Sequence, residues 1–248
     1  MANTTQFGEF MIKIFRTTLI LFCFILFGIG SLILSLVIFP LVSLFGGKKE
    51  IFANIIHISW KYFVRFFEIL HLIKINVTNY GNISGKIIVA SHPSLIDIVI
   101  LIGLFPKSTC MAKNEISKNP LVKNIIKHIY IVNDIDLEKL KKTAKEYLEE
   151  GFNIIIFPTG TRTNPGDDIK IHKGAATISL ATGAEIVPIN IKTNHPFLCK
   201  NQPIYVSTQH LIEYELKILN PINPNDYAQF DEIIARKHIC EEIKQNIQ

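Results

Sequence analysis

The sequence predicts an α/β domain, with a mixed, largely parallel sheet flanked by helices, behind an N-terminal hydrophobic membrane-anchoring helix or helical hairpin. Two observations predict this arrangement. From about residue 76 onward, short apolar segments alternate with amphipathic ones, which is the order of strands and helices in a parallel sheet. Before that point, 31 consecutive residues between Arg16 and Lys48 carry no charge. We therefore expect a membrane-anchoring helical segment over residues 1–75 and an α/β domain over residues 76–248.

The uncharged N-terminal run is too long for a signal-peptide core and has no cleavage site of the small-residue type. As a straight helix it would measure roughly 46 Å, against about 30 Å for the hydrocarbon core of a bilayer. Three arrangements remain: a tilted spanning helix, a helix kinked near Gly28 and Gly30, and a re-entrant hairpin that turns at residues 28–31. Basic residues flank both ends of the run, so the positive-inside rule orients a hairpin but not a single span. A buried core helix is the least favoured interpretation.

Residues 51–74 predict an amphipathic helix, because apolar and aromatic residues recur there at helical spacing between charged ones. The apolar face suits a lipid interface or an ordinary protein core equally well. Beyond it, strands are expected at 86–90, 109–112, 129–132, 153–157, 185–191 and 212–219. Helices are expected at 93–104, 120–127, 137–150, 175–182 and 226–245, two of them ending at a glycine.

Composition excludes several classes of function. The net charge is +5, but no run of like charges resembles a nucleic-acid-binding arm, so no nucleic-acid partner is expected. A mild basic excess fits an anionic membrane surface or an anionic substrate. The four cysteines lie far apart, which predicts neither a zinc site nor a disulfide framework and fits a reduced cytoplasmic compartment.

The first segment with candidate catalytic residues is Ser-His-Pro-Ser-Leu-Ile-Asp at residues 91–97, directly after the predicted strand 86–90. Pro93 suits the first position of a helix, so His92 is expected at the helix cap, at the strand end where α/β active sites gather. Asp97 can then accept a hydrogen bond from one imidazole nitrogen, leaving the other to take a proton from a hydroxyl. Alone, this spacing more often reflects a histidine that caps a helix and an aspartate on its solvated face.

The second such segment is Phe-Pro-Thr-Gly-Thr-Arg-Thr at residues 157–163, which follows another apolar strand. Gly160 permits a tight turn, and Arg162 offers a planar fork of donors suited to phosphate. Because parallel strands end on the same side of a sheet, we expect the two segments to face each other across one cleft. The plainer alternative is a polar turn with a surface arginine.

Together and in this order, the segments resemble the motifs of the glycerophospholipid acyltransferase family, best known for members that act on lysophosphatidic acid. His92 and Asp97 match its H-x-x-x-x-D block, and residues 157–162 match its F-P-E-G-T-R block apart from Thr159, where most members carry glutamate. Residues 130–132 lie where the family has an acceptor-binding block, which here ends in Asn133 rather than arginine. Residues 173–175 and 187–189 resemble two further blocks. These departures are similar to those of specialised members, including acyltransferases linked to aryl-polyene lipids.

The resemblance implies acyl transfer from acyl-CoA or acyl carrier protein to the hydroxyl of a lysophospholipid such as 1-acylglycerol-3-phosphate, with no cofactor and no metal. His92 would act as general base and Asp97 would hold it. Backbone donors near Gly160 would stabilise the oxyanion. It also implies a membrane-lipid partner and a place on the cytoplasmic face of the inner (plasma) membrane. A non-catalytic lipid-binding relative remains as the alternative, and a purely structural membrane anchor is less favoured. The expected substrate-binding residues are Thr159, Gly160, Thr161, Arg162, Lys113 and Lys173.

Overall fold

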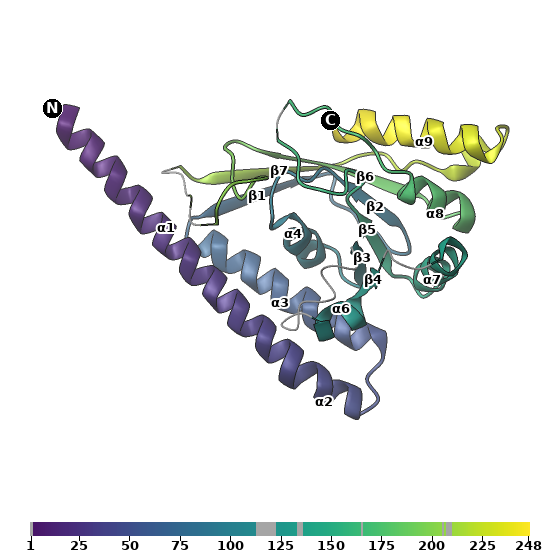
Figure 1. Ribbon diagram of the computed structural model, residues 1–248, viewed down its shortest axis with the longest axis horizontal. Helices are drawn as coiled ribbons and strands as arrows, with labels where there is room; N and C mark the ends of the chain where they lie inside the picture. The colour runs from purple at the N-terminus through teal and green to yellow at the C-terminus, as the bar shows by residue number, and fades with distance from the viewer. Residues whose placement is uncertain (1, 113–122, 133–135, 165, 205, 207–209) are drawn as a thin grey trace.

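The computed structural model describes residues 2–112, 123–132, 136–164, 166–204, 206 and 210–248. Its centre is a seven-stranded sheet in the order β1-β7-β6-β2-β5-β3-β4 (Figure 1). The strands are β1 (Ile73–Thr78), β2 (Ile87–Ala90), β3 (Ser108–Ala112), β4 (Tyr130–Val132), β5 (Asn153–Ile156), β6 (Ile186–Thr193) and β7 (Ile212–Ile218).

The sheet is mixed and largely parallel, as the sequence predicted. Strand β2 lies at its centre and is parallel to both of its neighbours, β5 and β6. All four residues of β2 are buried, and so are all four of β5, which is typical of strands covered on both faces. Strand β7 runs antiparallel to its neighbour β6 and pairs parallel with β1, so β1 and β7 run opposite to the other strands.

Strand β1 was not predicted, because the expected amphipathic helix ran through residue 74. The helix instead ends at Ile69, just before His71, whose φ of 54° is left-handed and incompatible with a continuing helix. Strand β1 begins only a few residues later, at Ile73. It therefore crosses the boundary near residue 75, and the division into two segments there stays a prediction.

Helices cover both faces of the sheet (Figure 1). One face carries α3 (Lys49–Ile69), α4 (Asp97–Leu104) and α6 (Lys123–Ile129), and the other carries α7 (Leu137–Glu149), α8 (Gly174–Thr182) and α9 (Glu232–Ile247). Each face has its own hydrophobic core, so the sheet is the middle layer of three.

The N-terminal run forms one continuous helical rod, so the hairpin at residues 28–31 is wrong. The rod consists of α1 (Ala2–Ile33), a π-helical segment η1 (Leu34–Ile38) and α2 (Phe39–Leu44). The π-helical segment ends two residues before Pro40, whose missing N–H interrupts the regular hydrogen-bond ladder. Among the described residues, the stretch Phe7–Leu44 is the one helix long and apolar enough to cross a membrane.

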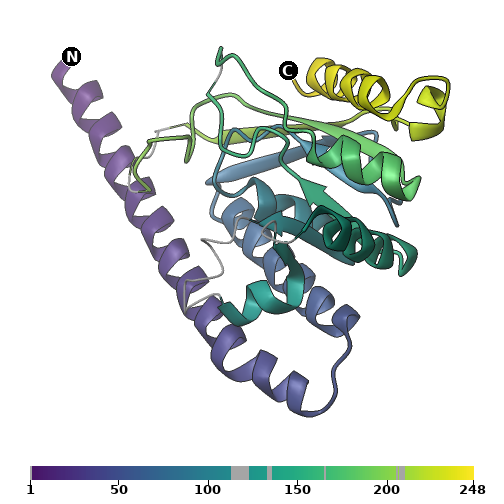
Figure 2. The same ribbon diagram turned by 45° about the vertical axis from the view of Figure 1, so that its right-hand side comes forward.

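One side of the rod packs against the domain. Phe24 contacts Phe67 edge to face, and the rings of Phe27 and Phe63 lie 4.7 Å apart. Arg16 donates hydrogen bonds to backbone carbonyls at the end of α3. Helix α3 therefore uses its apolar face for the protein core, and Figure 2 shows the rod passing along the outside of the molecule with its first turns projecting beyond it. The outer side of the rod is apolar as well; its exposed large side chains include Phe7, Phe10, Met11, Phe15, Phe22, Ile25, Leu26, Ile29, Leu36, Val37, Leu41, Leu44 and Phe45.

Two other predicted helices start later than expected. Helix α9 begins at Glu232 rather than at residue 226, because Asp231 caps it by accepting hydrogen bonds from the backbone N–H groups of Ile233 and Ile234. A short 3-10 helix, η2 (Pro224–Tyr227), precedes it. Helix α4 begins at Asp97 rather than at Pro93, which matters for the site below. The helix predicted at 120–127 lies partly outside the described residues, and α6 continues to Ile129.

Candidate active site

Three loops meet at the carboxyl ends of the central strands. The first loop (91–96) follows β2, the second loop (157–163) follows β5 and the third loop (194–200) follows β6. Because these strands are parallel neighbours, their carboxyl ends lie at the same edge of the sheet, where ligand sites of α/β proteins form.

The first loop brings His92 and Asp97 together. Nδ1 of His92 lies 2.8 Å from Oδ2 of Asp97, and the backbone N–H of Ser94 donates to the same carboxylate oxygen over 2.7 Å. The His92 side chain is 17% exposed, whereas that of Asp97 is 0% exposed. The carboxylate therefore holds one side of the imidazole from within the protein, and the other side stays within reach of solvent or substrate.

His92 is not a helix cap, contrary to the prediction. Residues 93–96 form an irregular turn, and the helix starts at Asp97. This turn folds the chain back, so that the carboxylate at the first residue of α4 meets the imidazole five positions earlier. A carboxylate is also favourable at a helix N-terminus, where backbone N–H groups point outward.

The surroundings of the pair are apolar and basic. The ring of Phe157 stacks on the His92 ring with a centroid distance of 4.0 Å and fixes its plane. Burial raises the pKa of Asp97, while the hydrogen bond and charge of His92, the Ser94 N–H and the charge of Arg162 act in the opposite direction. The carboxylate is thus costly to bury and depends on these partners.

Backbone hydrogen bonds join the three loops. The N–H of Thr163 donates to the carbonyl of His92, and the N–H of Leu95 donates to the carbonyl of Leu198. The hydroxyl of Ser91 donates to the carbonyl of Ile191 and accepts from the N–H of the same residue. The position of His92 is therefore determined by all three loops.

Arg162 links the second loop to the third. Its Nη1 donates to the carbonyls of Leu198 and Cys199 over 2.8 and 2.9 Å. Leu198 has a left-handed φ of 53°, a strained conformation for a leucine, so these bonds hold a backbone that would otherwise relax. The third loop was not predicted from the sequence. The binding groups of this loop are backbone carbonyls, which have no sequence signature.

The second loop forms a tight turn beside the pair. The Thr159 hydroxyl donates to the carbonyl of Thr161, and Gly160 has a φ of 67°, a conformation that glycine adopts most readily. A Cβ at Gly160 would lie 3.2 Å from His172, whose N–H donates to the carbonyl of Pro158.

Of the other predicted site residues, some lie near the second loop and others fall outside the described residues. Thr161 is exposed on this turn, and Lys173 is exposed immediately after His172, so both lie near the second loop. Lys113 and Asn133 lie outside the described residues. Among the residues that the structure describes, no group of three His, Cys, Asp or Glu side chains is placed to hold a metal ion.

Comparison with known proteins agrees with the motifs. A family model described as Acyltransferase matches residues 74–192. A 1-acyl-sn-glycerol-3-phosphate acyltransferase of Borreliella burgdorferi is 30% identical over 172 residues, which cover 60% of this chain and 68% of that protein. The chain belongs to the glycerophospholipid acyltransferase family. The resemblance seen in the motifs is thus confirmed, while the aryl-polyene branch stays a prediction.

Two further relatives define the extent of the match within the glycerophospholipid acyltransferase family. A 1-acyl-sn-glycerol-3-phosphate acyltransferase of Cocos nucifera is 29% identical over 168 residues, covering 63% of this chain but 52% of that protein, so the chain matches about half of its length. The crystal structure of the acyltransferase PlsC from Thermotoga maritima superposes with a TM-score of 0.71 at 22% identity, covering 95% of this chain and 97% of that one. This last similarity establishes the fold.

Proposed function

We propose that this protein transfers a fatty acyl group from an acyl thioester to the hydroxyl of a lysophospholipid such as 1-acylglycerol-3-phosphate. The observation that carries the proposal is the 2.8 Å contact between Nδ1 of His92 and Oδ2 of Asp97 at the carboxyl edge of the sheet. Membership of the glycerophospholipid acyltransferase family supports the reaction type, and the Borreliella burgdorferi relative carries that substrate in its name.

The reaction follows from the geometry of the pair. A carboxylate oxygen only accepts hydrogen bonds, so the shared proton lies on Nδ1 and Nε2 carries the lone pair. Nε2 takes the proton of the acceptor hydroxyl as its oxygen attacks the thioester carbonyl, and Asp97 stabilises the imidazolium that forms. The C–O bond forms, the C–S bond breaks, and the imidazolium proton leaves with the thiol. Backbone N–H groups of the second loop stabilise the developing oxyanion.

Acceptor binding is assigned to the second loop. Arg162 uses Nη1 for the third loop, and the rest of its guanidinium supplies donors for a phosphate. Thr161, Lys173 and Lys113 complete the proposed set of acceptor ligands. Acyl-CoA and acyl carrier protein both present the required thioester, and both are proposed donors. The proposed transfer, with His92 as its general base, requires no cofactor.

A specialised acceptor is the second candidate. The observation in its favour is Thr159, whose buried hydroxyl binds within its own turn rather than presenting the charge of the glutamate that most family members carry. An acceptor of the aryl-polyene type, or another lysolipid with a different head group, would fit this change.

The test is a transfer assay on the purified full chain. Labelled acyl-CoA or acyl carrier protein is incubated with 1-acylglycerol-3-phosphate and, separately, with other lysolipids. His92→Ala should lose most of the transfer, about 10²–10⁴-fold, because a general base contributes that much. His238→Ala, which removes an imidazole on α9, serves as the matched control and should keep full activity. A wild-type protein that binds lysolipid but transfers nothing would favour the non-catalytic lipid-binding alternative.

We also propose that the apolar rod attaches the protein to the cytoplasmic face of the inner membrane. The support is the row of exposed apolar side chains on its outer side, which soluble surfaces rarely carry. Replacing Phe22, Ile25 and Ile29 together with serine should release the protein from the membrane fraction, whereas serine at the buried Cys23 should not. Retention of the triple variant on lipid vesicles would contradict this attachment.

A further inference from the structure

Three polar atoms lie buried behind the His92–Asp97 pair without a hydrogen-bond partner. They are Oδ1 of Asp97, Oγ of Ser94 and the hydroxyl oxygen of Tyr214, and all three side chains are 0% exposed. Within the described part of the chain, Ser35 Oγ is the other buried side-chain atom of this kind. Buried polar atoms are nearly always hydrogen-bonded, so a carboxylate oxygen and two hydroxyls without partners in one region of the core need an explanation.

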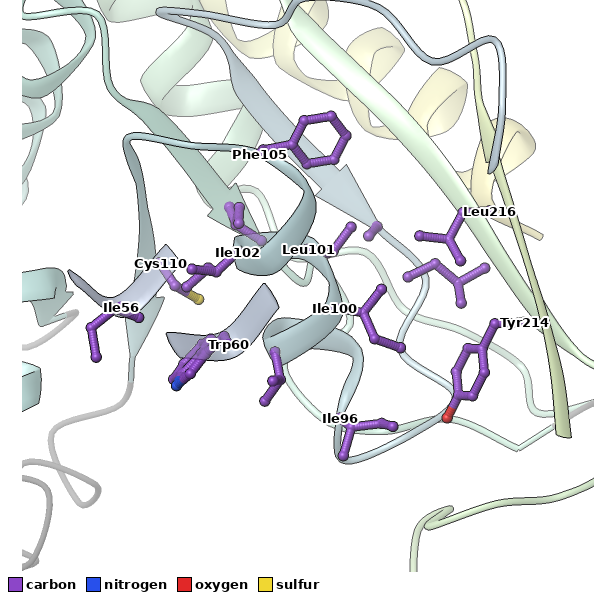
Figure 3. Packing of buried hydrophobic residues seen from close by; sticks show 14 of the residues in the cluster. Ile56, Trp60, Ile96, Ile100, Leu101, Ile102, Phe105, Cys110, Tyr214 and Leu216 are labelled. Carbon is purple, nitrogen blue, oxygen red and sulfur yellow. The ribbon is translucent and has the colours of Figure 1, made fainter. Parts of the chain in front are cut away.

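Tyr214 occupies a position that an apolar residue would fill. It lies in β7, where it is paired with Ile75 of β1 and Thr193 of β6. The other residues on its side of β7 are Ile212, Leu216 and Ile218, all buried. Figure 3 shows the ring beside Ile100 of α4, with the hydroxyl directed toward the turn that carries Ile96. A phenylalanine would provide the same packing, so the hydroxyl calls for a polar role.

The backbone N–H of Ser94 bonds directly to Asp97, and both residues act electrostatically on Tyr214. Burial raises the pKa of Tyr214 well above its usual value, the charge of Asp97 raises it further, and the interaction of its hydroxyl with that of Ser94 acts in the opposite direction, although their separation exceeds that of a formed hydrogen bond. On the other oxygen of Asp97, Oδ2, His92 and the Ser94 N–H already occupy the acceptor sites. Hydroxyl hydrogens rotate to suit their partners, and Oδ1 has two lone pairs to accept them.

We propose that Tyr214 and Ser94 are positioning residues whose hydroxyls donate to Oδ1 of Asp97 and keep its other oxygen aimed at His92. The inference rests on the proposed function, since it describes how the general base of that reaction is held. It extends the pair into a network of four side chains from the first loop, α4 and β7. The network links the loop after β2 to β7, which runs antiparallel to β6.

The network has a consequence for the pH dependence of the reaction. Donors to Oδ1 stabilise the ionised carboxylate, so their loss makes the pair hold its shared proton more tightly. The pair, which must accept a proton from the substrate hydroxyl, is then ready to do so only at higher pH. Among the described residues, the titratable or charged groups that interact with Asp97 are His92, Arg162, Cys199 and Tyr214. Burial raises the pKa of the Cys199 thiol as well as that of Tyr214, so neither group ionises on the acid limb, which belongs to the His92–Asp97 pair.

The test compares Tyr214→Phe with the wild type in kcat/KM against pH. We expect the acid limb to move up by about half to one pH unit, with the rate at high pH largely restored. A merely structural role would lower the rate equally at every pH. Tyr147→Phe, on α7 at the opposite face of the sheet, is the matched control and should leave the profile unchanged. Ser94→Ala keeps the backbone donor, should shift the limb in the same direction, and serves if Tyr214→Phe folds poorly.

A second measurement separates this inference from the proposed function. The His92 imidazole is titrated by NMR, its signal assigned by its loss in His92→Gln, and no turnover is required. An upward shift of its midpoint in Tyr214→Phe supports the network even for a protein that proves inactive. An active wild type whose His92 titration and acid limb are both unchanged by Tyr214→Phe and Ser94→Ala would overturn the network and leave the proposed function intact.

Discussion

Replacement of Asp97 with asparagine isolates the charge of the carboxylate from its hydrogen bonds. The hydrogen bonds from His92 and from the Ser94 N–H end on the same oxygen of Asp97. An amide carbonyl in that place keeps both bonds and therefore keeps the proton on Nδ1. What Asp97→Asn removes is the negative charge that stabilises the imidazolium.

The magnitude follows from that charge. An opposite charge at hydrogen-bond distance changes a pKa by about 1–3 units, or about 1.4–4 kcal/mol, so kcat should fall about 10–10³-fold. Without the anion the imidazolium is less stable, and the acid limb of the pH–rate profile should move to lower pH. Asp97→Ala also loses control of the tautomer, so its loss should be larger, about 10³–10⁴-fold.

The assay is steady-state acyl transfer across pH, together with thermal unfolding of each variant. Burial raises the pKa of Asp97 above its value in an unfolded chain, so its ionisation opposes folding at neutral pH. Asparagine removes this cost, and the midpoint of unfolding at pH 7 should not fall. A kcat for Asp97→Asn within threefold of the wild type, or an acid limb that moves upward, would refute this account of the pair.

Three further predictions concern the loops and one helix. Gly160→Ala should lower the stability by about 1–2 kcal/mol, because residue 160 has a left-handed backbone and the added Cβ contacts His172. Adding His172→Ala should restore part of this stability in thermal unfolding. A double variant without such a gain would exclude the contact as a cause. Arg162→Lys keeps the charge but loses two bonds to the third loop, so we expect a stability loss of about 1–3 kcal/mol in denaturant titration, together with a higher KM for the acceptor. An unchanged KM would count against phosphate binding. Asp231→Ala removes the cap of α9 and should cost about 1 kcal/mol in the same titration, with transfer activity unaltered.

Strands and motif loops could be predicted from the sequence where the local pattern of apolar residues agrees with their burial. Strands β2 and β5 are continuously apolar and buried, and each is followed at once by a polar segment. The meeting of His92, Asp97 and Arg162 follows from those two strands being parallel neighbours. Each of these residues follows one of the two strands closely in the chain, so its place at the edge of the sheet could be predicted.

The remaining features depend on contacts distant in the chain. Strand β1 is only partly buried and follows a helix after three residues, so its pattern resembled a continuation of that helix. The strained Leu198 is held through its carbonyl, a group that every residue carries. Tyr214 lies on the buried face of β7, and the direction of its hydroxyl depends on a turn more than a hundred residues earlier.

The pairing of β1 with β7 can form only late in the synthesis of the chain. The two strands lie at residues 73–78 and 212–218, and β7 is the neighbour that β1 has in the sheet. While the ribosome makes the intervening chain, the edge of β1 stays open to other strands. The apolar rod has emerged by then and can be shielded by a bilayer or a chaperone long before the sheet closes. A nascent chain stalled before residue 212 would carry the rod, His92 and Arg162, but it would lack Tyr214 and expose an unpaired strand, which makes it a target for aggregation or proteolysis.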